Sequence, residues 1–154
     1  MDKKNSYDDW WLPSDMENMG YFFEFCNNYT KEYFDTYVDA EKFTTAFMKS
    51  NCRHEMETGH PKLLSQAAVD TLRNYVEVDL NSDLSEFTVE EPVGYRVDQM
   101  YWVGWMYAYI HFEYDIPSAE LVNRLPVKEM LRLYGLGHEM SKELFLDKVK
   151  EALV

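Results

Sequence analysis

The residue types best suited to chemistry gather between positions 52 and 60 of this 154-residue chain. Cys52, His54 and His60 could supply thiolate and imidazole ligands to a zinc ion. Such a site closes with a second pair of ligands elsewhere in the chain, and the nearest candidate outside the stretch is the single Cys26. Two interpretations therefore stay open: a metal site, or a small core residue at Cys52 with both histidines on the surface.

A second metal pattern is incomplete. Two His-Glu-Met tripeptides, at 54–56 and 138–140, begin like the helix of a zincin metalloprotease. The fourth residue after each histidine, where a zincin has its second histidine, is Thr58 in one tripeptide and Lys142 in the other. The zincin motif is therefore absent.

His111 and Glu113 stand on a predicted helix beside several tyrosines and could act as acid and base. Residues two apart on a helix point to different faces, which favours two separate polar groups over a catalytic pair. The chain has no Gly-x-Ser-x-Gly motif, phosphate loop or dinucleotide fingerprint. We therefore predict a protein without enzymatic activity and without a cofactor.

The net charge of −13 is unevenly distributed along the chain. From Ser118 onward six acidic and six basic residues cancel, so the whole excess falls on residues 1–117, with 22 acidic residues and 9 basic ones. Such a field repels nucleic acid and anionic membranes and speeds the encounter with a basic protein partner. The alternative is that the acidity only keeps an aromatic-rich protein in solution.

The stretch 79–94, DLNSDLSEFTVEEPVG, has no helical period and carries five acidic residues and no basic one. We predict an acidic loop that is partly docked on the protein, in which 87–89 could form a short extended piece. The predicted partner-binding residues are the acidic side chains of this loop: Asp79, Asp83, Glu86, Glu90 and Glu91.

Residues 95–114, YRVDQMYWVGWMYAYIHFEY, predict the central helix of the fold. Asp98 can cap its start, and the segment is apolar nearly all round, as is typical of a helix inside a bundle. Gly104 in the helix interior costs roughly 1 kcal/mol relative to alanine, which indicates that another helix crosses closely there.

The segments before the acidic loop are also predicted to be helical. A Ser-x-x-Glu capping box at Ser14 starts one helix near Asp15, and Asp39 starts a second that runs to Thr58. Gly59 followed by Pro61 is the expected stop, and Ser65 can cap a third helix.

Shorter helices with caps and an apolar stripe follow from Ser118 to the end of the chain. The fold class is therefore all-α: one compact domain, residues 1–154, of about six to seven helices around the buried aromatic helix 95–114. Residues 1–13 are expected to form an N-terminal arm whose Trp10 and Trp11 dock onto the domain.

Only two cysteines occur, and the N-terminal sequence lacks the apolar run of a secretory signal. Both observations favour the cytoplasm. The longest apolar stretch, 100–110, is shorter than the roughly 20 residues that a membrane span needs, so no membrane association is expected.

Two stretches carry a family resemblance, HEMETGHPKLLSQAAVDTL and YWVGWMYAYIHFEYDIPSAELVNRLPVKEMLRLYGLGHEM. The first holds a Glu-x-Gly-His-Pro turn at 57–61, and the second holds Tyr-Trp-x-Gly-Trp at 101–105 and a later His-Glu at 138–139. The chain thereby resembles a group of small, acidic, uncharacterised bacterial proteins, in which asparagine is usual where His60 stands. The resemblance implies a bacterial accessory protein, a class rich in antitoxins, immunity proteins and inhibitors.

The sequence thus favours a non-enzymatic, acidic protein-binding module that docks a basic toxin, nuclease or other nucleic-acid-binding protein, as an inhibitor, an antitoxin or a nucleic-acid mimic. One alternative is a small metal-dependent enzyme or metal-binding module that uses Cys52, His54 and His60. A second is a helix-turn-helix in which Lys128 and Arg132 approach DNA, although the net charge opposes it. A third is an oligomeric structural subunit that associates through exposed aromatic side chains.

Overall fold

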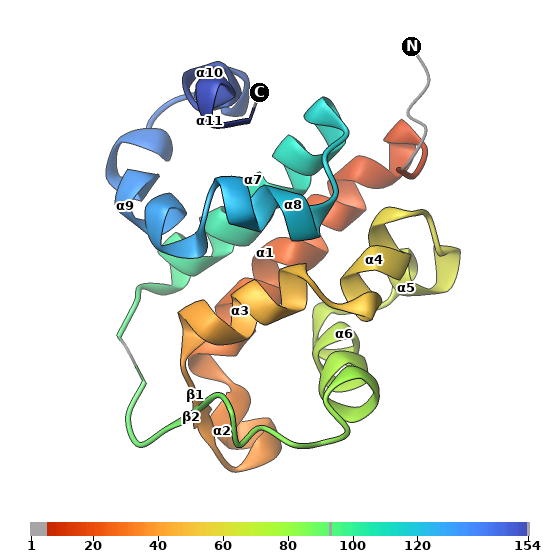
Figure 1. Cartoon of the computed structure of the whole chain (residues 1–154), viewed down its shortest axis with the longest axis vertical. Coiled ribbons are helices and arrows are strands. Elements are labelled where there is room, and N and C mark those ends of the chain that lie inside the picture. Colours follow the sequence, from red (N-terminus) through yellow and green to blue (C-terminus); the bar gives the residue numbers. More distant parts are fainter. Residues whose placement is uncertain (1–5, 93, 154) are drawn as a thin grey trace.

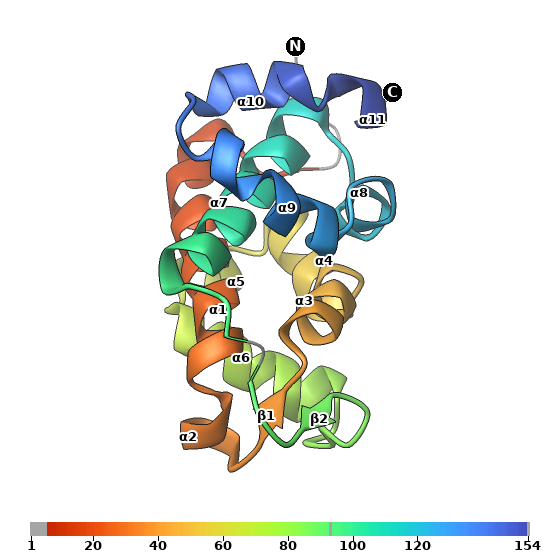
Figure 2. The same ribbon diagram turned by 90° about the vertical axis from the view of Figure 1, so that its left-hand side faces the viewer.

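Two long helices, α1 (Leu12–Asn28) and α7 (Val97–Tyr114), form the centre of the fold in the computed structural model of the protein (Figure 1). The structure describes residues 6–92 and 94–153, apart from the side chain of Asn28. The two helices run side by side in opposite directions, as both views show (Figures 1 and 2).

Eleven α-helices lie within the described residues. Besides α1 and α7 they are α2 (Thr30–Phe34), α3 (Ala40–Met48), α4 (Asn51–Glu57), α5 (Pro61–Ser65), α6 (Ala68–Asn74), α8 (Ser118–Arg124), α9 (Val127–Gly137), α10 (Lys142–Lys148) and α11 (Lys150–Leu153). A 3-10 turn, η1 (Asp9–Trp11), precedes α1, and a π-helical turn, η2 (Tyr75–Asp79), extends α6. The all-α fold class is confirmed, with more and shorter helices than the six to seven predicted.

The α1–α7 pair is unusually close. A Cβ atom added at Gly104 of α7 would lie 2.1 Å from the carbonyl oxygen of Met19 in α1. At Gly20 an added Cβ would lie 2.6 Å from the ring of Tyr101. The close helix crossing predicted at Gly104 is therefore confirmed, and small residues on both helices make it possible.

The other helices pack around this pair. Helices α3, α5 and α6 contact α1, whereas α8, α9 and α10 contact α7. The prediction that α7 is buried nearly all round is confirmed, since Val103, Met106 and Ala108, which point to different sides of the helix, are each 0% exposed and Trp102 is 8% exposed. The buried hydroxyl of Tyr107 donates to the carbonyl of Leu125 at 2.6 Å. Among the described residues no helix has the length and apolar character that a membrane span requires.

The two long helices begin at other residues than predicted. Helix α1 starts at Leu12 with Pro13 in its first turn, so Ser14 lies inside the helix and cannot cap it. Helix α7 starts at Val97, and Asp98 lies in its first turn. The Asp98 carboxylate accepts hydrogen bonds from the guanidinium of Arg96, at 3.1 and 2.6 Å, rather than capping the helix.

The helix predicted from Asp39 to Thr58 is two helices. Asp39 caps α3 as predicted, because its carboxylate accepts from the backbone N–H of Lys42 at 3.2 Å. Helix α3 ends at Met48, and the Ser50 hydroxyl then caps α4. An internal cap of this kind competes with helix continuation, which explains the break.

Gly59 ends α4 with a φ of +96°, the left-handed conformation expected of a stop signal. Pro61, predicted as part of that stop, also occupies the first turn of α5. Ser65 is the last residue of α5 rather than the cap of a third helix, and α6 begins after Ala67.

The acidic loop is docked on the body of the protein. Its strand β2 (Thr88–Val89) pairs in antiparallel fashion with β1 (Tyr37–Val38), which confirms a short extended piece. The backbone N–H of Asp39 donates to the carbonyl of Phe87 at 2.8 Å, and the Phe87 and Leu84 side chains are buried. The loop therefore holds its charged side chains on an anchored backbone.

The buried aromatic residue of the N-terminal arm is Tyr7, which is not among the residues predicted to dock. Tyr7 is 3% exposed and stacks on Phe112 with a centroid separation of 5.5 Å. Trp10 is 66% exposed and stacks on the partly buried Trp11, so the prediction that both tryptophans dock is wrong for Trp10. Residues 1–5 of the predicted arm lie outside the described residues.

Candidate functional site

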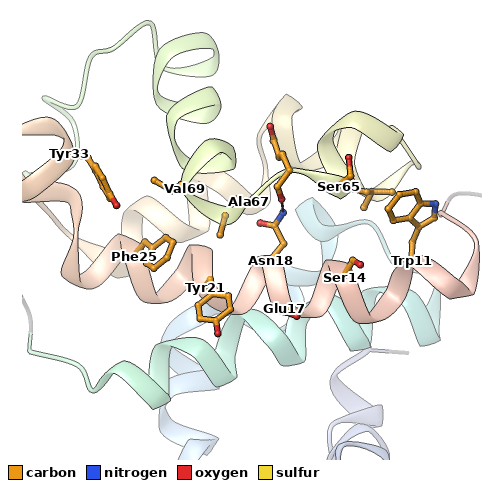
Figure 3. A pocket seen from close by; sticks show the side chains of 13 residues that line it. Trp11, Ser14, Glu17, Asn18, Tyr21, Phe25, Tyr33, Ser65, Ala67 and Val69 are labelled. Atoms are coloured by element: carbon orange, nitrogen blue, oxygen red, sulfur yellow. Dashed lines mark hydrogen bonds between the residues drawn. The ribbon is translucent and has the colours of Figure 1, made fainter.

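An open groove of about 620 Å³ separates α1 from the α5–α6 segment (Figure 3). Residues of α1 and its two flanking segments form one wall, and α5, α6 and the turn between them form the other. The lining residues are Trp11, Ser14, Glu17, Asn18, Tyr21, Phe25 and Tyr33 on the first wall, and Leu64, Ser65, Gln66, Ala67, Ala68 and Val69 on the second.

The two walls of the groove differ in chemistry. The α1 wall presents aromatic rings and the carboxylate of Glu17, whereas the α5–α6 wall presents small and aliphatic side chains. Asn18 links the walls at the floor, where its Nδ2 donates to the carbonyl of Gln66 at 3.0 Å (Figure 3). The Asn18 Oδ1 atom is buried and has no hydrogen-bond partner among the described residues.

A row of aromatic rings borders the groove along α1 and α2. We call Tyr21, Phe25, Tyr29 and Tyr33 the tyrosine ladder; successive ring centroids lie 6.0, 5.1 and 6.3 Å apart. The three tyrosines are 41%, 36% and 38% exposed. Half-exposed tyrosines combine a large apolar face with a polar tip, the combination that is enriched in protein–protein interfaces.

A second hollow, of about 490 Å³, adjoins the groove on the side of the acidic loop. Tyr33 lines both hollows, and Arg73 packs over its ring with Cζ 5.3 Å from the centroid. Ser82 and Ser85 of the loop line the second hollow, on either side of Asp83 in the sequence. The second hollow therefore joins the groove and the tyrosine ladder to the loop around Asp83, whereas Glu86 lines a separate hollow with Lys42 and Lys128.

The five predicted partner-binding residues divide into two groups. Asp83, Glu86, Glu90 and Glu91 are exposed. Asp79 is partly buried, and its carboxylate accepts from the backbone N–H of Cys52 in the first turn of α4 at 2.9 Å. Asp79 therefore holds η2 against α4, whereas the other four side chains extend from the surface, and Asp83 accepts from the backbone N–H of Ser85 at 3.0 Å.

The predicted metal ligands do not converge. Cys52 is buried, its Sγ accepts from the Asn74 amide at 3.5 Å, and burial raises the pKa of the thiol to about 11. His54 and His60 are both exposed. Within the described part of the chain, no three or more histidine, cysteine or carboxylate side chains lie close enough together to hold a metal ion.

The structure also contains a buried ionic cluster that the sequence did not predict. We call Asp15, Arg53, Glu57, His111 and Ser118 the Arg53 cluster; each is at most 3% exposed. The Arg53 guanidinium binds both oxygens of Asp15, at 2.7 and 3.0 Å, and donates from Nε to the Ser118 hydroxyl at 3.1 Å. The backbone N–H of Ser118 in turn donates to the Glu57 carboxylate at 3.1 and 3.0 Å. The cluster thereby joins α1, α4, α7 and α8.

Two residues of the N-terminal arm cover this cluster. The Tyr7 hydroxyl donates to Asp15 at 2.5 Å. His111 Nδ1 lies 2.7 Å from the carbonyl oxygen of Ile116, and because a carbonyl only accepts, Nδ1 carries the proton. His111 Nε2 is then free to accept from the Ser6 hydroxyl, 3.4 Å away. The lowered pKa of His111 favours the neutral imidazole, which fits both contacts.

Burial sets the charge states within the cluster. Burial and the nearby Arg53 charge lower the pKa of His111, against a smaller opposing effect of Glu57. Burial alone would raise the pKa of the Asp15 carboxyl, but the charge and hydrogen bonds of Arg53 and the Tyr7 hydroxyl hold it below its ordinary value. Within the described residues the cluster is closed to solvent, and its ion pairs and hydrogen bonds link four helices.

The sequence contains a signal for this cluster. Asp15 lies four residues before Met19 and seven before Phe22, which puts a carboxylate on the apolar stripe of α1. Arg53 and Glu57 stand one helical turn apart and flank the buried Met56. Charged residues on apolar stripes indicate buried ion pairs, although the pattern does not say which residues pair.

The Arg53 cluster makes stability depend on pH. The folded protein binds a proton at His111 less readily than the unfolded chain, so stability is fully present above the ordinary histidine pKa of about 6.5 and falls below it, by up to about 1.4 kcal/mol per pH unit. Urea unfolding between pH 5.5 and 8 measures this slope. A His111→Asn variant should be less stable at pH 8, but its free energy of unfolding should no longer fall as the pH is lowered to 5.5. The His54→Gln variant, changed at an exposed site, should keep the wild-type dependence on pH. An unchanged slope in His111→Asn would contradict the assignment.

Comparison of the chain with protein-family models, with curated proteins and with solved structures finds no match. The resemblance carried by the turn at 57–61 and the aromatic motif at 101–105 therefore stays a prediction.

Proposed function

We propose that this protein is a non-enzymatic binding module that docks a basic protein through the surface formed by the groove, the tyrosine ladder and the acidic loop. The observation that carries the proposal is that four loop carboxylates are exposed and form no ion pair among the described residues. Asp83, Glu86, Glu90 and Glu91 are exposed, and within the described residues none of them forms an ion pair with a basic side chain. Unpaired carboxylates on an anchored loop attract a cationic surface at low energetic cost.

The C-terminal helices show the contrast. Three of the six carboxylates from Ser118 onward form ion pairs, Glu120 with Arg124, Glu129 with Arg132 and Glu143 with Lys142, and the six basic residues of this segment balance the charge of all six. The excess of negative charge therefore falls on residues 1–117, and the acidic loop within them lies at the end of the molecule away from α10 and α11 (Figure 1). This asymmetry supports a directed encounter with a partner.

The two parts of the surface suit different steps of binding. Exposed charges at the rim of an interface govern the association rate, whereas aromatic contacts in its desolvated centre govern dissociation. The acidic loop suits the first role and the tyrosine ladder suits the second. The partner class that fits is a toxin, a nuclease or another protein that binds nucleic acid, and the protein would then act as its inhibitor or antitoxin in the cytoplasm.

A charge-neutralised variant tests the proposal. The partner is first captured from a lysate of the native host at low salt and identified, and its association rate is then measured by surface plasmon resonance across a salt series. The variant Asp83→Asn, Glu86→Gln, Glu90→Gln, Glu91→Gln is expected to slow association roughly tenfold or more at low salt, because steering depends on these charges. Its dissociation rate should change much less.

The matched control is Glu139→Gln, Glu143→Gln, Asp147→Asn, Glu151→Gln at the opposite end of the molecule, which changes the net charge by the same amount. All four control residues are exposed. The control should associate at nearly the wild-type rate. If both variants slow association equally, net charge alone acts and the loop is not the docking surface; salt-insensitive association would reject the proposal altogether.

A further inference from the structure

The groove between α1 and the α5–α6 segment has the chemistry of a receptor for cations. Of the 13 residues that line it none is basic, and Glu17 on the α1 wall carries a carboxylate. The rings of Tyr21 and Phe25 on the same wall carry negative π-faces, and the ring of Tyr33, which also lines the groove, has Arg73 packed over it. The opposite wall, with Leu64, Ala68 and Val69, offers apolar contact and no charge.

We propose that the groove binds an extended segment of the partner in which basic and apolar side chains alternate. Alternate side chains of an extended chain point in opposite directions. One set, arginine or lysine, then meets Glu17 and the ladder rings on the α1 wall, while the other set meets the aliphatic wall. This inference rests on the proposed function and specifies which part of the partner enters which part of the surface.

The length of the groove suits a short extended segment. The α1 wall from Ser14 to Phe25 is roughly 16 Å long at 1.5 Å per residue, the length of about five residues of extended chain. The two walls differ in chemistry along this length, and an extended chain can present a different kind of side chain to each of them.

One hydrogen-bond acceptor at the floor of the groove, the Asn18 Oδ1 atom, has no donor among the described residues. Asn18 is 6% exposed, and its Nδ2 is committed to the Gln66 carbonyl. Its Oδ1 has no partner among the described residues, and a buried acceptor without a donor is costly. A guanidinium or backbone N–H of the bound segment would supply that donor. This orphaned acceptor is independent of the charge argument and points to the same kind of occupant.

One contact within the chain already shows the expected recognition. The guanidinium of Arg73 in α6 lies over the ring of Tyr33, at the end of the groove that joins the second hollow. The other ladder tyrosine that lines the groove, Tyr21, has an exposed ring and no cation packed over it in the described residues. The partner's cation is expected at this ring and at the neighbouring Glu17.

A matched pair of peptides tests the inference. The ¹⁵N-labelled protein is titrated at low salt with Ac-Arg-Leu-Arg-Leu-Arg-Leu-NH2 and with the analogue in which citrulline, the neutral isostere, replaces each arginine. The arginine peptide is expected to shift the side-chain amide signal of Asn18 in a saturable way and to bind about tenfold more tightly than the citrulline peptide. Glu17→Gln should remove most of that difference.

A blocking variant and its control complete the test. Ala67→Tyr puts a ring into the groove at an exposed position, and it should weaken binding of the arginine peptide about tenfold, whereas Ala152→Tyr at an exposed site in α11 should not. Equal binding of the two peptides, unchanged binding by Ala67→Tyr, or no shift at millimolar peptide would each overturn the inference. If the captured partner still dissociates from Ala67→Tyr at the wild-type rate while loop neutralisation slows association, the inference fails and the proposed function stands.

Discussion

Replacing Arg53 by methionine is expected to lower the free energy of unfolding by about 3–5 kcal/mol. The substitution keeps most of the apolar stem but removes the charge that compensates two buried carboxylates. Asp15 would lose both of its hydrogen bonds from the guanidinium, and Glu57 would lose the Nε atom 3.5 Å away. Urea unfolding followed by circular dichroism at pH 7.5 measures the change.

Two further variants separate charge burial from the loss of a side chain. Arg132→Met removes an arginine whose partner, Glu129, is also on the surface, so the stability should hardly change. Adding Asp15→Asn to the Arg53→Met variant removes one of the stranded charges and should restore part of the loss. If Arg53→Met is no more damaging than Arg132→Met, the Arg53 cluster does not stabilise the fold.

Replacing Gly104 by alanine is expected to destabilise the protein by about 3 kcal/mol or more. The new Cβ would lie 2.1 Å from the Met19 carbonyl oxygen and 2.7 Å from its carbonyl carbon. Backbone atoms cannot move aside as a flexible side chain can, so α1 and α7 would have to separate along their contact. Thermal and urea unfolding of the purified variant would measure this loss.

The control for this prediction is another helical glycine. An added Cβ at Gly135 in α9 would meet no atom within 4 Å, so Gly135→Ala should stabilise the protein by roughly 0.5–1 kcal/mol through the higher helix propensity of alanine. Opposite signs at Gly104 and Gly135 would show that the close crossing sets the requirement for glycine. A loss of stability in both variants would indicate instead that substitution of a helical glycine is harmful in general.

The sequence predicts the helical fold well because its information is local. The all-round apolar pattern of 95–114 and the internal Gly104 are sufficient to predict a buried helix with a close neighbour, and both features are present. The predicted helix boundaries are less accurate where two local sequence signals compete. Pro13 overrides the capping box at Ser14, and the Ser50 cap divides an apolar pattern that continues across it.

The candidate site was only partly predictable, because it depends on contacts between distant segments. The acidic composition indicates the loop, yet nothing local distinguishes Asp79, which accepts from the backbone N–H of Cys52, from the exposed Glu90 and Glu91. The groove needs α1 beside α5 and α6, a pairing that no motif encodes. Tyr21 and Tyr33 stand in a helical segment like core aromatics, and only the fold shows that they remain exposed.

Helices α1 and α7 pack together in the fold but lie far apart in the sequence. This separation affects how the chain folds during its synthesis. Helix α1 leaves the ribosome early, but the helix that covers its glycine face is made only after the acidic loop. Contacts between distant segments form late, since closing the intervening chain costs entropy before the contact is made. During that interval the apolar side chains of α1 depend on the helices made before α7, chiefly α3, α5 and α6, for cover, and such nascent states are prone to aggregation. The negative charges of the first 117 residues then repel one nascent chain from another at the stage when the core is still open.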